Sequence, residues 1–114
     1  MLTVYIASPY TRGDVGQNVL AQLDTANILM DHGVCPIVPL FAQYQHMRHP
    51  RDYEDWITIN IEKLRRCDVL VRLPGKSSGA DEEVKYAEEN GIPVVYGLLE
   101  FIDKVNTFEE RCTL

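Results

Sequence analysis

The sequence has few basic residues, few cysteines and no long apolar run, and each shortage argues against a class of protein. Its 114 residues include 11 Lys and Arg against 17 Asp and Glu, which gives a net charge of −6. Nucleic-acid polymers are bound by basic patches that displace condensed counterions, so this balance argues against such a partner. A mononucleotide remains possible, because one phosphate needs only a local site.

Cysteine occurs only at Cys35, Cys67 and Cys112, without a CxxC pair. The odd number and wide spacing predict no disulfide framework and a reducing compartment. The first residues, MLTVYIASPY, contain neither a basic leader nor a long apolar stretch. They predict a first strand in place of a signal peptide, so we expect a cytoplasmic protein with no membrane partner.

The length suits one compact domain over residues 1–114. Short β-branched stretches alternate along it with helical periodicities, which predicts an α/β, Rossmann- or flavodoxin-like three-layer sandwich around a parallel sheet of four to five strands. We expect strands at residues 2–7, 35–40, 67–73 and 92–99, helices at residues 18–32, 53–66 and from 79, and an amphipathic helix in the tail. In the first helix the apolar stripe is formed by Val19, Leu23, Ala26 and Met30.

Ligands of parallel sheets bind at the carboxyl ends of the strands, which here are SPYTRG, PLFAQYQH and PGKSSGAD. The third of these is a glycine-rich loop that leads directly into a helix. Its free backbone N–H groups and serine hydroxyls could hold a phosphate, and the serines could instead be simple N-caps. The candidate substrate-binding residues of this loop are Ser77, Ser78, Gly79 and Asp81.

The helix after this loop carries an acid on its inward side. Ala80, Glu83, Val84 and Ala87 share one face, because residues three and four apart are neighbours on a helix. A carboxylate at such a position has a cost that function usually explains. The structural alternative is that Glu83 complements the positive end of the helix dipole.

Asn60 also faces inward by its spacing from apolar neighbours in the preceding helix. A buried amide needs hydrogen-bond partners, so it could be a structural hub. Its helix and the helix from Gly79 flank the same expected strand, and Asn60 and Glu83 could therefore converge at one end of it.

Three segments, VYIASPYT, RRCDVLVRLPG and SSGADEEVKYAEENGIPVVY, resemble the nucleoside 2-deoxyribosyltransferase superfamily, which includes the 2′-deoxynucleoside 5′-monophosphate N-hydrolases. The resemblance covers most of residues 2–96, and its sharpest element is Gly-x-x-x-Glu at a helix start. It implies cleavage of the N-glycosidic bond of a (deoxy)nucleoside 5′-monophosphate, by hydrolysis or transfer to a second base. The resemblance implies no cofactor. It implies that the protein forms a homodimer or a larger homo-oligomer.

The resemblance also implies roles for single residues. Glu83 matches the nucleophile, Ser77 the phosphate-binding serine, and Tyr5 the first-strand tyrosine that helps to hold the nucleophile. Ser8 and Arg12 stand in the place of the first loop that contacts phosphate or sugar.

One position departs from the pattern, because members of the superfamily commonly carry an aspartate where this chain has Asn60. An amide cannot donate a proton as an acid, so Asp81 or Asp55 could assist the leaving base instead. Loss of activity is the alternative, and it would leave a non-catalytic nucleotide-binding or sensing module on the same fold.

Residues 41–52, expected as an irregular loop, would cover the nucleobase. Phe41 and Tyr44 are candidates for stacking on the base. Trp56 is a further stacking candidate, although it is more expected in the core. Gln43 or Gln45 could read the edge of the base. An anionic ligand or a second subunit could be contacted by Arg48, Arg51 or His49. His46 and His49 lack a cysteine or a clear acidic third ligand, so we expect surface histidines and no metal.

Overall fold

The computed structural model describes residues 1–113, with side chains described as far as residue 110. Strands β1 (Thr3–Ala7), β2 (Cys35–Ile37), β3 (Val69–Arg72) and β4 (Val94–Tyr96) form one sheet in the order β2-β1-β3-β4. Every neighbouring pair is parallel. The predicted parallel α/β sheet is confirmed, and β1 and β3 lie at its centre.

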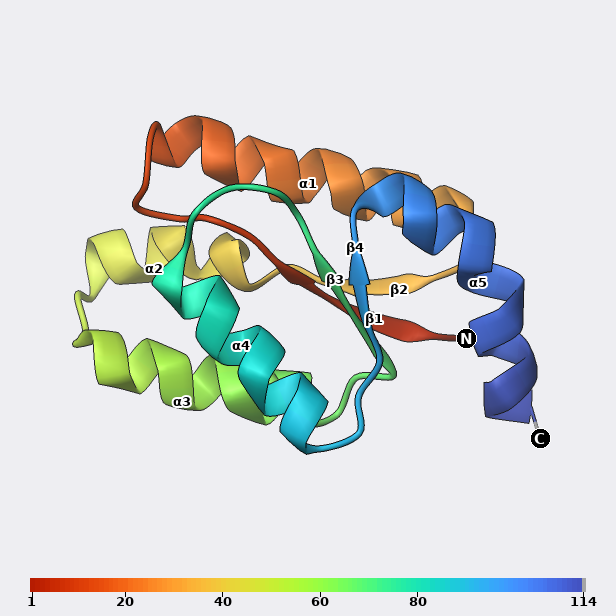
Figure 1. Cartoon of the computed structure of the whole chain (residues 1–114). Helices are drawn as coiled ribbons and strands as arrows, with labels where there is room; N and C mark the ends of the chain where they lie inside the picture. The colour runs from red at the N-terminus through yellow and green to blue at the C-terminus, as the bar shows by residue number, and fades with distance from the viewer. Residues whose placement is uncertain (114) are drawn as a thin grey trace.

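Helices cover both faces of the sheet, which makes three layers (Figure 1). Helices α1 and α5 pack on one face, while α3 and α4 pack on the other. Within residues 1–113, none of the helices is both long enough and apolar enough to cross a lipid bilayer. The helical elements are α1 (Val15–Asp31), the 3-10 turn η1 (Pro39–Ala42), α2 (Gln43–Arg48), α3 (Tyr53–Leu64), α4 (Ser78–Glu89) and α5 (Leu98–Thr113).

The alternation of side chains along β1 decides which residues meet which helices. Val4 and Ile6 enter the core beneath α1 and α5, whereas Tyr5 and Ala7 point to the opposite face with α3 and α4. Successive side chains of a strand point to opposite faces, so this division follows from the period of two. Tyr5 therefore lies on the same side of the sheet as Glu83 of α4.

The structure corrects three details of the sequence-based expectation. Residues 39–48 are helical, as η1 and α2, where the end of a strand was expected up to residue 40 and an irregular loop from residue 41. The fourth strand ends at Tyr96, because Gly97 adopts φ of +95° and α5 begins at the next residue. Helix α1 buries a different face, which consists of Gln22, Thr25, Ala26 and Leu29, and it leaves Met30 exposed.

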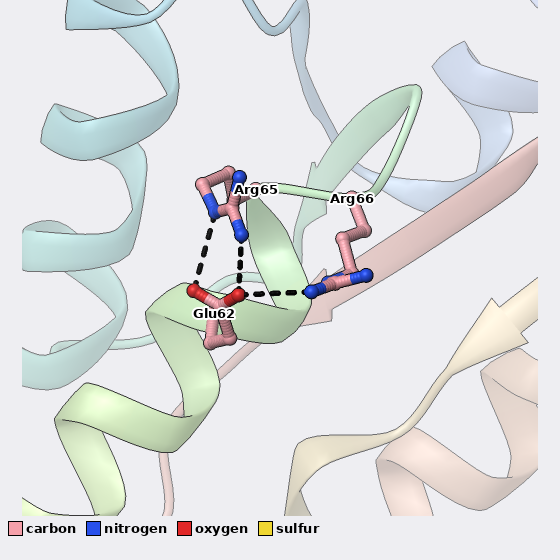
Figure 2. Close-up of polar contacts among 3 residues, drawn as sticks. All are labelled: Glu62, Arg65 and Arg66. Atoms are coloured by element: carbon pink, nitrogen blue, oxygen red, sulfur yellow. Dashed lines mark hydrogen bonds and ion pairs between the residues drawn. The ribbon is translucent and has the colours of Figure 1, made fainter.

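The carboxyl end of α3 is closed by a surface cluster of charges (Figure 2). Glu62 accepts hydrogen bonds from Arg65 and, at 3.1 Å, from Arg66. The hydrogen bonds of Arg65 and then Arg66 lower the pKa of Glu62 to about 2. Because all three side chains are exposed, this cluster orders the helix end and adds little to stability.

Cys35 and Cys67 carry free thiols, and the side chain of Cys112 lies outside the described residues. Cys67 is buried and donates to the carbonyl oxygen of Lys63 at 3.3 Å. Burial raises the pKa of Cys67 to about 12, which keeps the thiol protonated and unreactive.

Gly75, in the loop after β3, packs against Pro9, in the loop after β1. Its φ is +116°, and a Cβ placed there would lie 2.7 Å from Cγ of Pro9. We expect Gly75→Ala to lower the free energy of unfolding by about 1–3 kcal/mol, through backbone strain and this clash. Urea unfolding measures the loss.

Gly91→Ala is the matched control for this substitution. Gly91 has φ of +74°, and a Cβ would meet nothing within 4 Å. It should therefore show backbone strain alone and a smaller loss. Equal losses in the two variants would contradict the close packing of the two loops.

Candidate active site

Helix α4 places Glu83 in the interior of the protein. The helix buries Ala80, Glu83, Val84 and Ala87, the same four residues that share the predicted inward stripe. The Glu83 residue is only 6% exposed, and its Oε2 accepts a hydrogen bond from the hydroxyl of Tyr5. A strand residue and a helix residue 78 positions apart in sequence thus form one buried pair.

The surroundings of this pair favour protons on both groups. Burial raises the pKa of Glu83 to about 7, although the Tyr5 hydrogen bond and the charge of Arg72 act in the opposite direction. Burial and the Glu83 carboxylate raise the pKa of Tyr5 well above its ordinary value. Tyr5 is therefore a lasting hydrogen-bond donor, and Glu83 exchanges its proton near neutral pH.

The amino end of α4 carries backbone N–H groups beside a cavity. Ser77 is the N-cap, with its side chain accepting from the backbone N–H of Ala80 at 3.1 Å. The first N–H groups of a helix have no partner within the helix, and they lie at its positive end. Those of Ser78 and Gly79 belong to residues that line a cavity.

This cavity has a volume of about 420 Å³, within the usual range for small-molecule sites. It lies at the carboxyl end of the sheet, where the sequence placed it. Most of the predicted site residues meet there: Ser8, Arg12, Asn60, Ser77, Ser78, Gly79 and Glu83.

Two of the acids considered for the leaving base do not reach the cavity. The side chain of Asp81 is 73% exposed and pairs with Arg72 at 3.3 Å. Asp55 is exposed and pairs with Arg51 at 3.5 Å. Among the described residues, Glu83 is the one carboxylate in the cavity wall.

Phe41 and Tyr44 also lie away from the cavity. Of the residues in η1 and α2, His46 lines the cavity, Gln43 lines both the cavity and a neighbouring hollow, and Phe41 and Tyr44 line that hollow alone. Phe41 and Tyr44 are exposed and line a separate surface hollow beside α1. The structure therefore does not bring these two rings to the site.

Arg72, the last residue of β3, was not recognised from the sequence. It is buried, and its guanidinium donates to the carbonyl oxygens of Leu73 and, at 2.7 Å, of Gly75. With the Asp81 pair, it ties the loop after β3 to the first turn of α4. A lone arginine inside the apolar run DVLVRL is the signal that could have identified it.

Gln22 of α1 was missed as well. It is fully buried, donates to the carbonyl oxygen of Ile6 at 3.0 Å and to Oγ of Ser8 at 2.8 Å, and accepts from the N–H of Leu40 at 3.2 Å. Because Oγ of Ser8 accepts this bond, the hydroxyl keeps its own proton for another acceptor. Ser8 is thus oriented as a donor in the cavity wall.

Tyr53, at the start of α3, brings a phenol to the amino end of α4. Its hydroxyl oxygen lies 3.4 Å from the point where a Cβ on Gly79 would stand, and the residue lines the cavity. Burial and the nearby Glu82 carboxylate raise the pKa of Tyr53, so the phenol is a neutral donor.

His46 and Trp56 form one wall of the cavity. The indole N–H of Trp56 donates to Nδ1 of His46 at 2.8 Å, and the rings meet edge to face. His46, expected as a surface histidine, and Trp56, a stacking candidate that was more expected in the core, are both half-buried at the cavity. No cluster of three or more potential metal ligands occurs in the described part of the chain.

The fold defined by this sheet and these helices is that of the 2-deoxyribosyltransferases. One such enzyme, from Leishmania mexicana, matches with a TM-score of 0.64 and 20% identity over 84% of this chain. Another, from Bacillus psychrosaccharolyticus, matches with a TM-score of 0.59 and 18% identity over 82% of this chain and 70% of its own. The TM-scores establish a shared fold, and at these low identities they establish the fold alone. The chain spans only 63% of the Leishmania enzyme.

Residues 2–97 match the family described as a domain of unknown function, DUF7768, and the chain belongs to this family. No curated protein sequence matches it.

The raised pKa of Glu83 has a consequence for stability. Its pKa is about 7 in the folded protein, against 4.5 for a glutamate that is not buried, so the folded protein binds this proton more tightly. The contribution to stability is fully present below pH 4.5 and is lost as the pH rises through 7. We expect Glu83→Gln, which can still accept from Tyr5, to be more stable than the wild type above pH 7 by up to about 3 kcal/mol.

Urea unfolding of both proteins at pH 4.5 and pH 8 measures this difference. Glu82→Gln, which removes the neighbouring exposed carboxylate, is the control and should follow the wild type closely. If the free energies of unfolding of the wild type and of Glu83→Gln change by the same amount between pH 4.5 and pH 8, the result would contradict the burial of a titrating acid.

Proposed function

We propose that the protein cleaves the N-glycosidic bond of a nucleoside 5′-monophosphate with Glu83 as the nucleophile. The observation that carries the proposal is one buried carboxylate in the wall of a cavity of about 420 Å³, bonded to Tyr5 and ionising near pH 7. The 2-deoxyribosyltransferase fold supports it, since those neighbours are named for the transfer of a deoxyribosyl group.

The chemistry needs a carboxylate and a leaving base. A carboxylate oxygen of Glu83 attacks C1′ of the sugar, the C1′–N bond breaks, and its electron pair departs with the base. The positive charge that develops on the sugar is stabilised by the carboxylate, as in glycoside hydrolysis. Attack of water on C1′ of the glycosyl ester then gives hydrolysis, and attack of a second base gives transfer.

The phosphate would bind at the amino end of α4, to the N–H groups of Ser78 and Gly79 and the hydroxyl of Ser77. Arg12 and the oriented hydroxyl of Ser8 line the same cavity. Gly79 and Glu83 are four residues apart, about 6 Å along the helix axis. A pentose 5′-phosphate spans such a distance, so one helix would hold the phosphate and attack the sugar.

A second candidate is a module that binds nucleotides without cleaving them. Its support is Asn60, an amide where the related enzymes commonly carry an acid, in a cavity where Glu83 is the one carboxylate among the described lining residues. Binding would then use the same anion site and leave the glycosidic bond intact.

Incubation with a panel of ribo- and deoxynucleoside 5′-monophosphates and nucleosides, followed by chromatography, tests the proposal. We expect free base from at least one monophosphate and a loss of at least about a thousandfold in Glu83→Gln. Glu82→Gln is the matched control, because its carboxylate is exposed, and it should keep the activity. Nucleotides that bind saturably and are recovered intact would establish the binding module instead.

The pH dependence provides a separate check on Glu83 and Tyr5. The nucleophile must be ionised, so we expect kcat/KM to rise with pH through about 7. The Tyr5 hydrogen bond lowers the pKa of Glu83, so Tyr5→Phe should move this rise to higher pH. A pH profile that is unchanged in Tyr5→Phe would contradict the role of the phenol in holding the nucleophile.

A further inference from the structure

The hydrogen bonds of His46 fix the position of its ring proton. Nδ1 receives the indole N–H of Trp56 at 2.8 Å and the backbone N–H of Arg51 at 3.3 Å. Both groups can only donate, so Nδ1 must be the acceptor and the proton of the neutral ring lies on Nε2. His46 lines the cavity, so Nε2–H is the donor that its neutral ring can offer to a ligand there.

Two side-chain amides lie one helical turn from this contact. Gln43 precedes His46 by three residues on α2, and Asn60 follows Trp56 by four residues on α3, so each shares a helix face with its neighbour. Residues 49–52 connect α2 to α3. Along each helix, the amide lies farther from this connection than the ring of His46 or Trp56 does. Both amides line the same cavity.

Each of these amides has an oxygen without a hydrogen-bond partner among the described residues. These atoms are the buried Oε1 of Gln43 and Oδ1 of Asn60. Each such oxygen costs free energy until a donor reaches it. A terminal amide turns easily about its last bond, so Gln43 and Asn60 can adapt to a ligand, whereas His46 is held by two donors and cannot.

The described lining residues include no second acid that could protonate the departing base. A base that leaves with the electron pair of the C1′–N bond becomes negative unless a proton reaches it. A base with a carbonyl group spreads this charge onto oxygen, where an N–H donor stabilises it. The fixed N–H of His46 suits that oxygen and does not suit an amino group in its place.

We infer that the cavity selects nucleobases that carry a carbonyl oxygen beside a ring N–H, with His46 as the residue that contacts the carbonyl and Trp56 as the residue that positions His46. This inference rests on the proposed function for the identity of the ligand as a nucleotide. Hypoxanthine, guanine, uracil and thymine have such an edge. Adenine and cytosine have an amino group at the corresponding position, beside a ring nitrogen that carries no hydrogen, and cytosine keeps a carbonyl only at C2.

Two matched substrate pairs test the inference. Hypoxanthine and adenine 5′-monophosphates, and uracil and cytosine 5′-monophosphates, differ at the relevant edge. We expect kcat/KM to be at least about tenfold higher for the carbonyl member of each pair, in the ribo or the deoxy series, because the amino member leaves a buried donor unpaired. Calorimetry with Glu83→Gln measures the same preference in binding, without turnover.

Variants separate His46 from a general effect on the fold. His46→Phe should reduce the preference to less than about threefold, and His49→Phe, an exposed ring outside the cavity, should leave it unchanged. Trp56→Phe keeps the histidine but removes the shorter of the two hydrogen bonds to Nδ1 and leaves the one from the N–H of Arg51, so it should also weaken the preference. Nitrogen-15 NMR of the imidazole should show the Nε2–H form of His46 in the wild type and a mixture of forms in Trp56→Phe.

The possible outcomes distinguish this inference from the proposed function. Base release without a preference for the carbonyl member, or an Nδ1–H form of His46 in the wild type, overturns the inference and leaves the proposed function standing. A binding preference that depends on His46, without base release, supports the inference and overturns the proposed reaction. Release and preference together support both.

Discussion

The site depends on keeping one carboxylate out of water. In solvent the pKa of Glu83 would be 4.5, whereas burial raises it to about 7. The Tyr5 hydroxyl and the Arg72 charge offset part of that cost. These two partners come from β1 and β3, which pair directly in the centre of the sheet. The strand order thus provides both groups that make a buried acid tolerable.

Much of the fold could be predicted, because burial leaves a period in the sequence. The stripe of Ala80, Glu83, Val84 and Ala87 predicts the buried face of α4 correctly, since packing against a sheet selects every third or fourth residue. The same logic fails for α1, where Gln22 is buried and Met30 is exposed. Gln22 is buried because three hydrogen bonds satisfy its amide, and these partners lie far away in sequence.

The cavity wall from α2 was the least predictable part. Its helix is short and has no fully buried residue, so no apolar period marks which side faces inward. Polar and aromatic residues alternate there, and Phe41 and Tyr44 attracted attention because they are large rings. The contact of His46 with Trp56 joins two helices, and a pattern within either helix cannot reveal it.

The close packing of Gly75 on Pro9 joins the two loops that border the cavity. Arg72 then links the second of these loops to the start of α4. A displacement of either rim would have to carry the other with it, because neither has free space at the contact. The two loops at the mouth of the cavity are therefore expected to move together as one rigid unit. Adjustment to a ligand would then be confined to side chains such as Gln43 and Asn60.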